Sequence, residues 1–382
     1  LAGRKLVASW KVLNTYSIPE PVVGGLAVAL LLWLLHATAA IQVGFDKTLG
    51  PPLMLAFFAC IGLNADLPSL LRGGRPLVVL LAVVVGFLVL QNLTGIGLAM
   101  LLGQSPLVGL LAGSISLSGG HGTGAAWSAV FTERYQLAGA KEIAIASATF
   151  GLVLGGVIGG PVARHLLGKV RVKPGADSAH QEPTLFEHPA EVRLITAPAL
   201  IETLALISVC LLVGQQIARA LAGTFMELPA FVCVLFVGVI LRNGLAAAGK
   251  YTVFERAVSV LGNVSLALFL ALALMSMRLW ELSSLALPML VLLLGQTALM
   301  AAYAIFVTFP VMGRNYDAAV IAAGHCGFGL GATPTAIANM QAVTDRFGNS
   351  PLAFLVVPMV GAFFIDLANA LVIKLFLMLP LY

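Results

Sequence analysis

Two glycine-rich segments hold most of the residues that suit ligand binding in an otherwise apolar chain. The first, hairpin one, spans residues 106–131 and includes Ser-Gly-Gly-His-Gly-Thr at 118–123. Glycine permits backbone conformations closed to other residues and lets a ligand approach the main chain. A helix broken here exposes N–H groups that suit an anion and carbonyl groups that suit a cation. A tight helix crossing lined by small residues is the alternative explanation.

The second segment, hairpin two, spans residues 316–341 and includes Gly-His-Cys-Gly-Phe-Gly-Leu-Gly-Ala-Thr-Pro-Thr at 324–335. Pro334 lacks a backbone donor and predicts a turn at the tip. The glycine spacing is neither that of a phosphate-binding loop nor that of a dinucleotide fingerprint, because no Lys-Ser/Thr pair follows it and no alternation of strands and helices surrounds it.

Two histidines, His121 and His325, lie in these segments. They can sense protons or contact a carboxylate, but we expect them mainly to position the hairpin backbone. They are too far apart in the chain, with too few partners, to predict a zinc site. Arg278 ends an apolar stretch, where it either extends toward the membrane surface or donates to a substrate carboxylate.

Polar side chains inside apolar stretches form a second group of candidates. Asp366 and Asn369 are three residues apart and therefore share one helix face. A carboxylate within a membrane is costly, so Asp366 is a functional candidate that can ligate Na⁺, pair with a cation or carry a proton. A hydrogen-bonded structural carboxylate is the alternative. Asn64 is a further candidate, and a simple link between helices is its equally open alternative.

Three amides, Gln91, Asn92 and Gln296, also lie in apolar stretches. Neutral amides in membrane helices often only link one helix to another. Both a binding role and a linking role stay open for them at this stage.

The elements that must position these residues are membrane helices. Of the 382 residues, 60% are hydrophobic and 10% charged, and the mean hydropathy is +1.01. Soluble domains carry about 25% charged residues. The four cysteines lie in apolar or glycine-rich runs, as small hydrophobic residues would. We predict apolar spans over 19–38, 49–70, 76–102, 142–163, 194–222, 228–246, 259–277, 284–309 and 351–379.

The sequence consists of two halves that resemble each other. A hydrophilic stretch at 169–193 separates residues 1–168 from residues 194–382, and similar motifs recur about 210 residues apart. For example, Ile-Pro-Glu-Pro-Val at 18–22 and Leu-Pro-Ala-Phe-Val at 228–232 each open a span. We therefore expect each half to hold five helices and one re-entrant hairpin.

The repeat also predicts topology. The span at 194–222 has no full partner in the first half, so we expect one helix upstream of residue 1. Five crossings per half make the second half inverted, an arrangement common in secondary transporters. With the linker 169–193 in the cytoplasm and the C-terminus in the periplasm, most lysines and arginines fall on the cytoplasmic side, which agrees with the positive-inside rule.

Several motifs of this sequence resemble those of the bacterial sodium/glutamate symporter family, and the resemblance extends over essentially the whole chain. The runs that carry the resemblance are IPEPVVGGL at 18–26, LMLAFFACIGLNAD at 53–66, LSGGHGTGAAWSAVF at 117–131, AAGHCGFGLGATPTAIANM at 322–340 and FLVVPMVGAFFIDLANALVIK at 354–374. The resemblance implies sodium-driven uptake of L-glutamate across the bacterial inner membrane, two inverted five-helix halves, and a relation to sodium/citrate carriers. Those carriers work as homodimers by an elevator motion.

Ligand roles then fall on the two hairpin motifs. The expected substrate-binding residues are Ser116, Ser118, Gly119, Gly120, His121, Gly122, Thr123, Gly329, Gly331, Ala332, Thr333 and Thr335. The expected sodium ligands are Asn64, Ser118, Gly327, Asn339, Asp366 and Asn369. Na⁺ is the coupling ion, and we expect no other cofactor and no transition metal. The other expected partners are membrane lipid and a second copy of the chain. The net charge of +5 needs no nucleic acid to explain it.

Three rival functions remain at this stage. A carrier of citrate or another dicarboxylate would share the architecture and differ in substrate. A channel would use similar helices, although paired hairpins favour alternating access. A membrane-embedded enzyme is disfavoured, because the sequence places no nucleophile beside a base and no metal cluster.

Overall fold

The chain is built from helices. The computed structural model describes residues 2–10, 20–39, 45–46, 48–170, 195–224, 228–249, 251–275 and 286–381. Every regular element in those residues is helical and none is a strand, so the predicted all-α class is confirmed. The α-helices are α1 (Ala2–Ser9), α3 (Glu20–Ala39), α4 (Gly50–Asn64), α5 (Pro68–Leu101), α6 (Pro106–Leu110), α7 (Gly120–Tyr135), α8 (Ala140–Val170), α9 (Ala197–Leu221), α10 (Ala230–Ala247), α11 (Glu255–Met275), α12 (Ala286–Tyr303), α13 (Phe309–Val311), α14 (Tyr316–Leu330), α15 (Thr333–Phe347), α16 (Pro351–Met359) and α17 (Ile365–Leu377). Short π-helical stretches lie at η1 (Leu111–Ile115), η3 (Ala304–Thr308) and η4 (Val360–Phe364).

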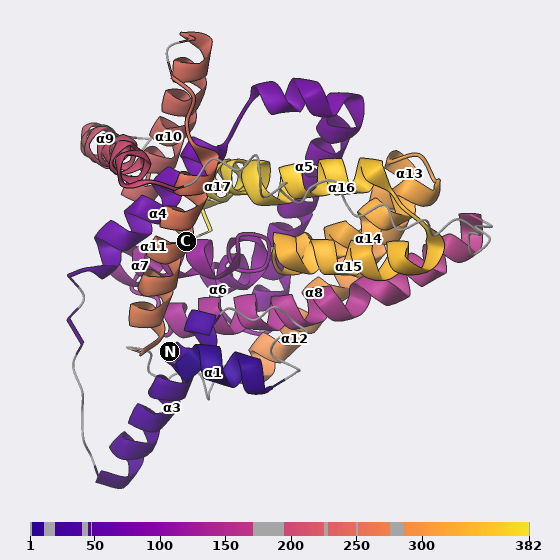
Figure 1. Cartoon of the computed structure of the whole chain (residues 1–382). Coiled ribbons are helices and arrows are strands. Elements are labelled where there is room, and N and C mark those ends of the chain that lie inside the picture. Colours follow the sequence, from indigo (N-terminus) through magenta and orange to yellow (C-terminus); the bar gives the residue numbers. More distant parts are fainter. Residues whose placement is uncertain are drawn as a thin grey trace.

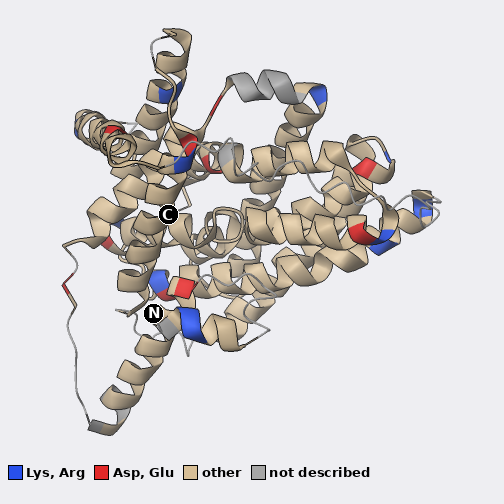
Figure 2. Cartoon of the chain, in the orientation of Figure 1, with Lys and Arg blue, Asp and Glu red and all other residues tan. Residues whose placement is uncertain are grey.

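Several helices are suited to cross a bilayer. In the described residues, six are long and apolar enough, and the count becomes seven if α16 and α17, which are bent by 46°, form one broken span. These seven coincide with predicted spans. Figure 2 shows that the helix bodies carry few charged residues, which lie mostly at helix ends and in loops. The four cysteines are free and buried, as predicted.

The predicted span 49–70 is wrong at its end, over residues 65–70. Helix α4 ends at Asn64, because Ala65 leaves the helical conformation with φ −78° and ψ 88°. Pro68 then starts α5, where its missing N–H group is tolerated. The 15 residues of α4 are about 22 Å long, shorter than the hydrocarbon core of a bilayer.

The helices form two groups, which Figure 1 shows on different sides of the molecule. The flanking bundle comprises α3, α4, α9, α10 and α11, which pack mainly on one another. The hairpin bundle comprises α5 to α8 and α12 to α17, with the π-helical stretches between them. The main contacts between the groups are α7 on α11, α17 on α10 and η4 on α4.

Apolar side chains fill the boundary between the bundles. The ring of Trp127 on α7 lies 5.4 Å from Phe231 on α10, which lies 4.7 Å from Phe58 on α4. A second cluster joins Ala125 of α7 to Leu270 of α11. Such apolar contacts are non-directional.

Both predicted hairpins fold as a helix, a break and a second helix. In hairpin one, α6 and η1 run to the break at 116–119 and α7 follows. In hairpin two, two residues separate α14 from α15, and the helices pack closely. A Cβ atom built on Gly327 would lie 2.4 Å from Cα of Ala336, so only glycine allows this approach.

The base of hairpin two is held by a polar clasp. Ser350 donates a hydrogen bond from Oγ to Oδ1 of Asp317 (2.6 Å), and the Tyr316 hydroxyl donates to the carbonyl of Gly348. Asn315 caps α14 by accepting a hydrogen bond from N–H of Ala318 (2.9 Å). These contacts fix where the hairpin starts and ends.

We expect Ser350→Ala to lower the free energy of unfolding by about 1.5–3 kcal/mol, the range for a hydrogen bond to a charged group. The half-buried Asp317 would lose its hydroxyl donor. The measurement is the temperature at which purified protein loses its monodisperse elution peak. Ser208→Ala, an exposed serine bonded within α9, is the matched control. Equal melting temperatures in both variants would contradict the clasp.

Candidate functional site at the tips of two broken helices

The break in hairpin one is stabilised by two asparagines. Gly113 has non-helical dihedral angles, φ −100° and ψ −135°. Just beyond it, N–H of Ser114 donates to Oδ1 of Asn92 (3.0 Å), and the carbonyl of Ser114 accepts from Nδ2 of Asn369 (2.9 Å). N–H of Gly119 also donates to this carbonyl (2.9 Å). A buried peptide freed from its helix thus keeps its hydrogen bonds.

The tips of the two hairpins meet at one buried glutamine. The single hydroxyl proton of Ser118 is shared between two acceptors, Oε1 of Gln91 (2.7 Å from Oγ) and the carbonyl oxygen of Gly329 (2.9 Å). Nε2 of Gln91 donates to the same carbonyl (3.1 Å). Nε2 of Gln296 in turn donates to the backbone carbonyl of Gln91 (2.8 Å). Residues 211 positions apart are therefore joined by a closed set of hydrogen bonds.

The loops of the two tips are also close. Gly120 adopts φ +69°, a conformation that side chains disfavour, and a Cβ built on it would lie 3.8 Å from the carbonyl oxygen of Gly331. In hairpin two, Ala332 is extended and Thr333 starts α15, while N–H of Ala332 donates to the carbonyl of Gly327 (3.2 Å). The first turns of α7 and α15, which carry N–H groups not used within a helix, thus begin at these tips.

Asp366 lies beside the first turn of α7. The hydroxyl of Thr123 approaches Oδ1 of Asp366 at 3.5 Å, a long contact. Asp366 is partly exposed, whereas Thr123 is buried. A carboxylate at this depth with one weak donor still has several oxygen lone pairs free to bind a cation.

Several buried oxygen atoms around hairpin one have no hydrogen-bond partner within the described part of the chain. They are Oγ of Ser114, Oγ of Ser116 and Oδ1 of Asn369, and Oγ1 of Thr335 in hairpin two shares this property. Buried polar atoms without partners are rare and require an explanation such as a bound ion or water. Hydroxyl, amide and carboxylate oxygens are suitable ligands for Na⁺.

The remaining hairpin candidates have close packing contacts. A Cβ on Gly122 would lie 2.6 Å from the ring of Phe57, and one on Gly329 would lie 2.7 Å from the Met300 sulfur. Nδ2 of Asn339 donates to the carbonyls of Gly155 (2.9 Å) and Ala323 (3.2 Å), which joins hairpin two to α8.

Both histidines are held within the hairpin bundle. Nε2 of His121 lies 3.0 Å from the hydroxyl of Thr149. Nδ1 of His325 lies 2.9 Å from the hydroxyl of Thr308, and its ring stacks on Phe328 at 4.9 Å. These partners fix the position of each ring in its hairpin.

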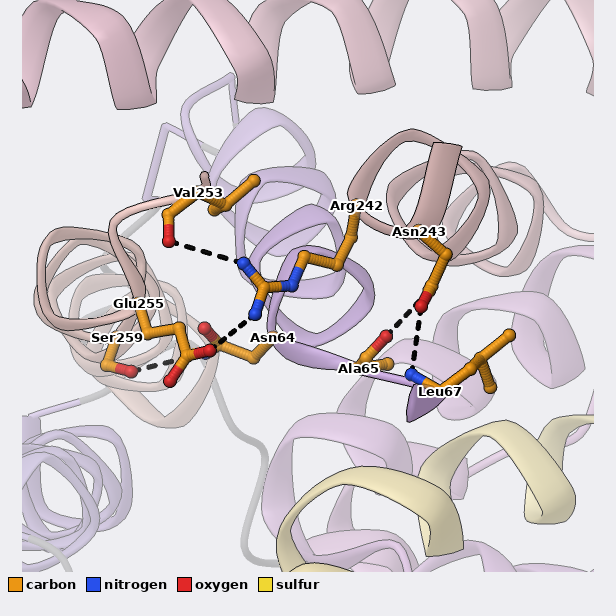
Figure 3. A network of polar contacts seen from close by, with 8 residues as sticks. All are labelled: Asn64, Ala65, Leu67, Arg242, Asn243, Val253, Glu255 and Ser259. Atoms are coloured by element: carbon orange, nitrogen blue, oxygen red, sulfur yellow. Dashed lines mark hydrogen bonds and ion pairs between the residues drawn. The ribbon is translucent and has the colours of Figure 1, made fainter. Parts of the chain in front are cut away.

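Asn64 is placed with the flanking bundle, where its Nδ2 donates to Oγ of Ser259 (3.2 Å) (Figure 3). Its hydrogen bond therefore ties α4 to α11 rather than to a hairpin. Arg278 lies outside the described residues.

The structure brings together residues that the sequence identified only as separate candidates. Ser118 meets Gly329, Thr123 meets Asp366, and Asn369 reaches hairpin one. Gln91 and Asn92 prove to be links from α5 to the hairpins, although the sequence left their role open. An adjacent pair of amides in an apolar helix indicated that Gln91 and Asn92 matter, but this pattern does not identify their hydrogen-bond partners.

Long apolar helices that enclose two broken helices are typical of multi-pass helical membrane proteins, which is the class of this chain. Comparison with known proteins narrows it. Residues 1–349 match the family described as "Sodium/glutamate symporter". The chain is 66% identical over 382 residues to the sodium/glutamate symporter of Escherichia coli (strain K12), covering 100% of this chain and 95% of that protein. It is 55% identical over 376 residues to that of Haemophilus influenzae (strain ATCC 51907 / DSM 11121 / KW20 / Rd), covering 98% of this chain and 93% of that protein.

The chain belongs to the sodium/glutamate symporter family, a family of membrane transporters, and the resemblance found in its motifs is confirmed.

Proposed function

We propose that this protein carries L-glutamate into the bacterial cell together with Na⁺, across the inner membrane and by alternating access. The observation that carries the proposal is the junction of the two hairpin tips through Gln91, with Asp366 and unpaired oxygen atoms beside it. Relatives that match nearly the full chain are named sodium/glutamate symporters, which supports this choice of substrate and ion.

The energetics require a coupled cation. Glutamate is a net monoanion near neutral pH, and an inside-negative potential of 100 mV opposes its entry by about 2.3 kcal/mol. One Na⁺ per glutamate cancels this electrical cost, and two would make the potential assist uptake. The transporter therefore needs to bind the glutamate anion and Na⁺ together.

We assign the substrate to the hairpin tips. The first turns of α7 and α15 offer N–H groups to the glutamate carboxylates, with Ser116, Ser118, Thr123, Thr333 and Thr335 as hydroxyl donors. The glycines 119, 120, 122, 329 and 331, with Ala332, leave room at the backbone, and His121 lines the same tip.

We assign Na⁺ to the oxygen-rich side of hairpin one, with Asp366 and Asn369 as the principal side-chain ligands. Their placement beside Thr123 and Ser114 supports this assignment. Ser118, Gly327 and Asn339 remain further candidates from the tips and from hairpin two. Asn64 is the weakest candidate, because its hydrogen bond lies in the flanking bundle.

We further propose the inverted-repeat topology, with residues 1–168 and 194–382 as repeats and 169–193 as a cytoplasmic linker. The C-terminus is then periplasmic, and hairpins 106–131 and 316–341 are re-entrant from opposite sides. Glycines with positive φ support the repeat, because Gly103 and Gly313 precede the hairpins while Gly139 and Gly348 follow them, at offsets of 313 − 103 = 210 and 348 − 139 = 209.

The division into two bundles supports an elevator motion, in which the hairpin bundle carries its ligands past the flanking bundle of a homodimer. Cysteines engineered at Ala125 and Leu270, which share one apolar cluster, test this motion. We expect disulfide formation between them to depend on Na⁺ and glutamate. Cross-linking at one rate in every ligand condition would overturn the elevator.

The deciding experiment for transport is uptake of radiolabelled L-glutamate by proteoliposomes. An inward Na⁺ gradient is compared with an equal K⁺ gradient, each with a proton ionophore. We expect accumulation with Na⁺ alone and no effect of the ionophore. Accumulation of citrate or aspartate in place of glutamate would overturn the substrate, and accumulation that the ionophore abolishes would overturn the coupling ion.

A further inference from the structure

The connector between α4 and α5, residues Ala65–Leu67, is where the chain passes from the flanking bundle into the hairpin bundle. The chain passes between the bundles at two further places, after α8 and after α11, and only this connector lies wholly within the described residues. Any movement of one bundle against the other must be accommodated at such places.

The side chain of Asn243 on α10 holds the connector at both ends. Its Oδ1 accepts a hydrogen bond from N–H of Leu67 (2.9 Å), and its Nδ2 donates to the carbonyl of Ala65 (2.9 Å) (Figure 3). Nδ2 also donates to the carbonyl of Val239 (2.7 Å), one turn back on α10. The amide thus ties peptide groups outside α4 to the helix that carries it.

The surroundings of Asn243 make α4, α10 and α11 one unit at this end. The neighbouring Arg242 donates to the carbonyl of Val253 (3.3 Å) and pairs with Glu255 at 2.5 Å, which fixes the turn into α11. Asn64 and Ser259 join α4 to α11 beside them (Figure 3). A Cβ on Gly62 would lie 2.2 Å from the carbonyl oxygen of Leu235, so the backbones of α4 and α10 are in contact.

A glycine with non-helical dihedral angles lies a few residues beyond the connector. Gly74 adopts φ +61° and ψ −159°, which divides α5 into a short first segment and the candidate span Gly74–Leu101. A Cβ there would meet only Cδ of Pro76, at 3.9 Å, so the space on that side of the backbone is open. Glycine in open space can absorb large changes in φ and ψ.

We infer that Asn243 is a positioning residue that anchors the connector to the flanking bundle, so that relative movement of the two bundles is taken up at Gly74. The inference rests on the proposed transport function. With the anchor intact, the chain leaves the flanking bundle for the hairpin bundle from one fixed point. Without it, the connector detaches from α10 and the bundles adopt orientations that do not expose the site productively.

Asn243→Ala tests the anchor in the full chain, with Asn263→Ala, an exposed asparagine on α11, as the matched control. We expect the maximal rate of glutamate uptake per folded transporter to fall about tenfold, since a net hydrogen-bond loss of about 1.4 kcal/mol corresponds to that factor. The dissociation constant for glutamate in detergent should change less than about twofold, because the hydrogen bonds of the Asn243 side chain go to Leu67, Ala65 and Val239, which lie outside both hairpins. Asn243→Asp keeps the acceptor for Leu67 and loses the donor to Ala65. Its maximal uptake rate should lie between those of the unsubstituted protein and of Asn243→Ala.

Two structural readouts separate anchoring from a general loss of stability. Hydrogen exchange at the Leu67 amide should accelerate in Asn243→Ala and not in Asn263→Ala. Spin labels at Ile240 and Leu101, both exposed, should report a broader distance distribution between the bundles only in Asn243→Ala.

An unchanged exchange rate and distance distribution in Asn243→Ala would overturn the anchor. So would a loss of uptake that is matched by equal losses of glutamate affinity and melting temperature. The unsubstituted protein tests the proposed function separately. If it shows no sodium-driven glutamate uptake, that function fails while exchange and distance still decide the anchor.

Discussion

Replacing Gln91 with leucine is expected to lower the maximal rate of sodium-driven glutamate uptake by between about tenfold and a hundredfold. Gln91 is buried and is the only side chain in the described residues seen to hydrogen-bond both hairpin tips, at Ser118 and at Gly329. Leucine fills a similar volume but leaves the Gly329 carbonyl with one donor fewer. The Gly329 carbonyl keeps the Ser118 hydroxyl as a donor, so the cost is the loss of the two hydrogen bonds of the Gln91 amide, about 1–3 kcal/mol in all, which sets the expected range.

The second half of this experiment is a double-mutant cycle. Ser118→Ala alone should have a smaller effect, because Gln91 still donates to Gly329. The double variant should lose less than the sum of the two, with a coupling free energy of about 0.5–3 kcal/mol. Gln341→Leu, at an exposed position on α15, is the matched control for protein amount and folding. Additive effects, or normal uptake in Gln91→Leu, would show that the tips are not coupled through this side chain.

The sequence predicted helices well where hydrophobicity determines them. Seven of the predicted spans coincide with candidate crossings, because a long apolar run has no other stable conformation in a bilayer. The end of α4 was missed, since Ala65 and Leu67 are apolar and hydropathy does not register a change of backbone direction. The nearby Pro68 was the available signal.

The candidate site was only partly predictable. Glycine and hydroxyl patterns located both breaks, because those residue types permit a broken helix wherever it occurs. The contact between Ser118 and Gly329 depends on how two segments 211 residues apart pack, which no local pattern encodes. The same limit applied to Asn243, whose partners lie 176 and 178 residues away in the chain.

Neutralising Asp366 is expected to weaken the binding of the coupling Na⁺ strongly. Asp366→Asn keeps the shape of the side chain and its contact with Thr123 but removes the negative charge. A carboxylate about 4 Å from a cation contributes about 4 kcal/mol at an effective dielectric constant of about 20. Loss of this electrostatic attraction alone should raise the concentration of Na⁺ that half-saturates uptake by at least about a hundredfold.

Sodium titration of uptake and calorimetric Na⁺ binding both measure this change. Asp366→Glu retains the charge at a different reach, so its sodium dependence should shift less than that of Asp366→Asn. Asp345→Asn, an exposed carboxylate on α15, controls for the loss of one negative charge elsewhere in the hairpin bundle. If Asp366→Asn kept its sodium dependence but lost glutamate affinity, the carboxylate would instead act through the hairpin tip, because Thr123 is the residue that connects it to α7.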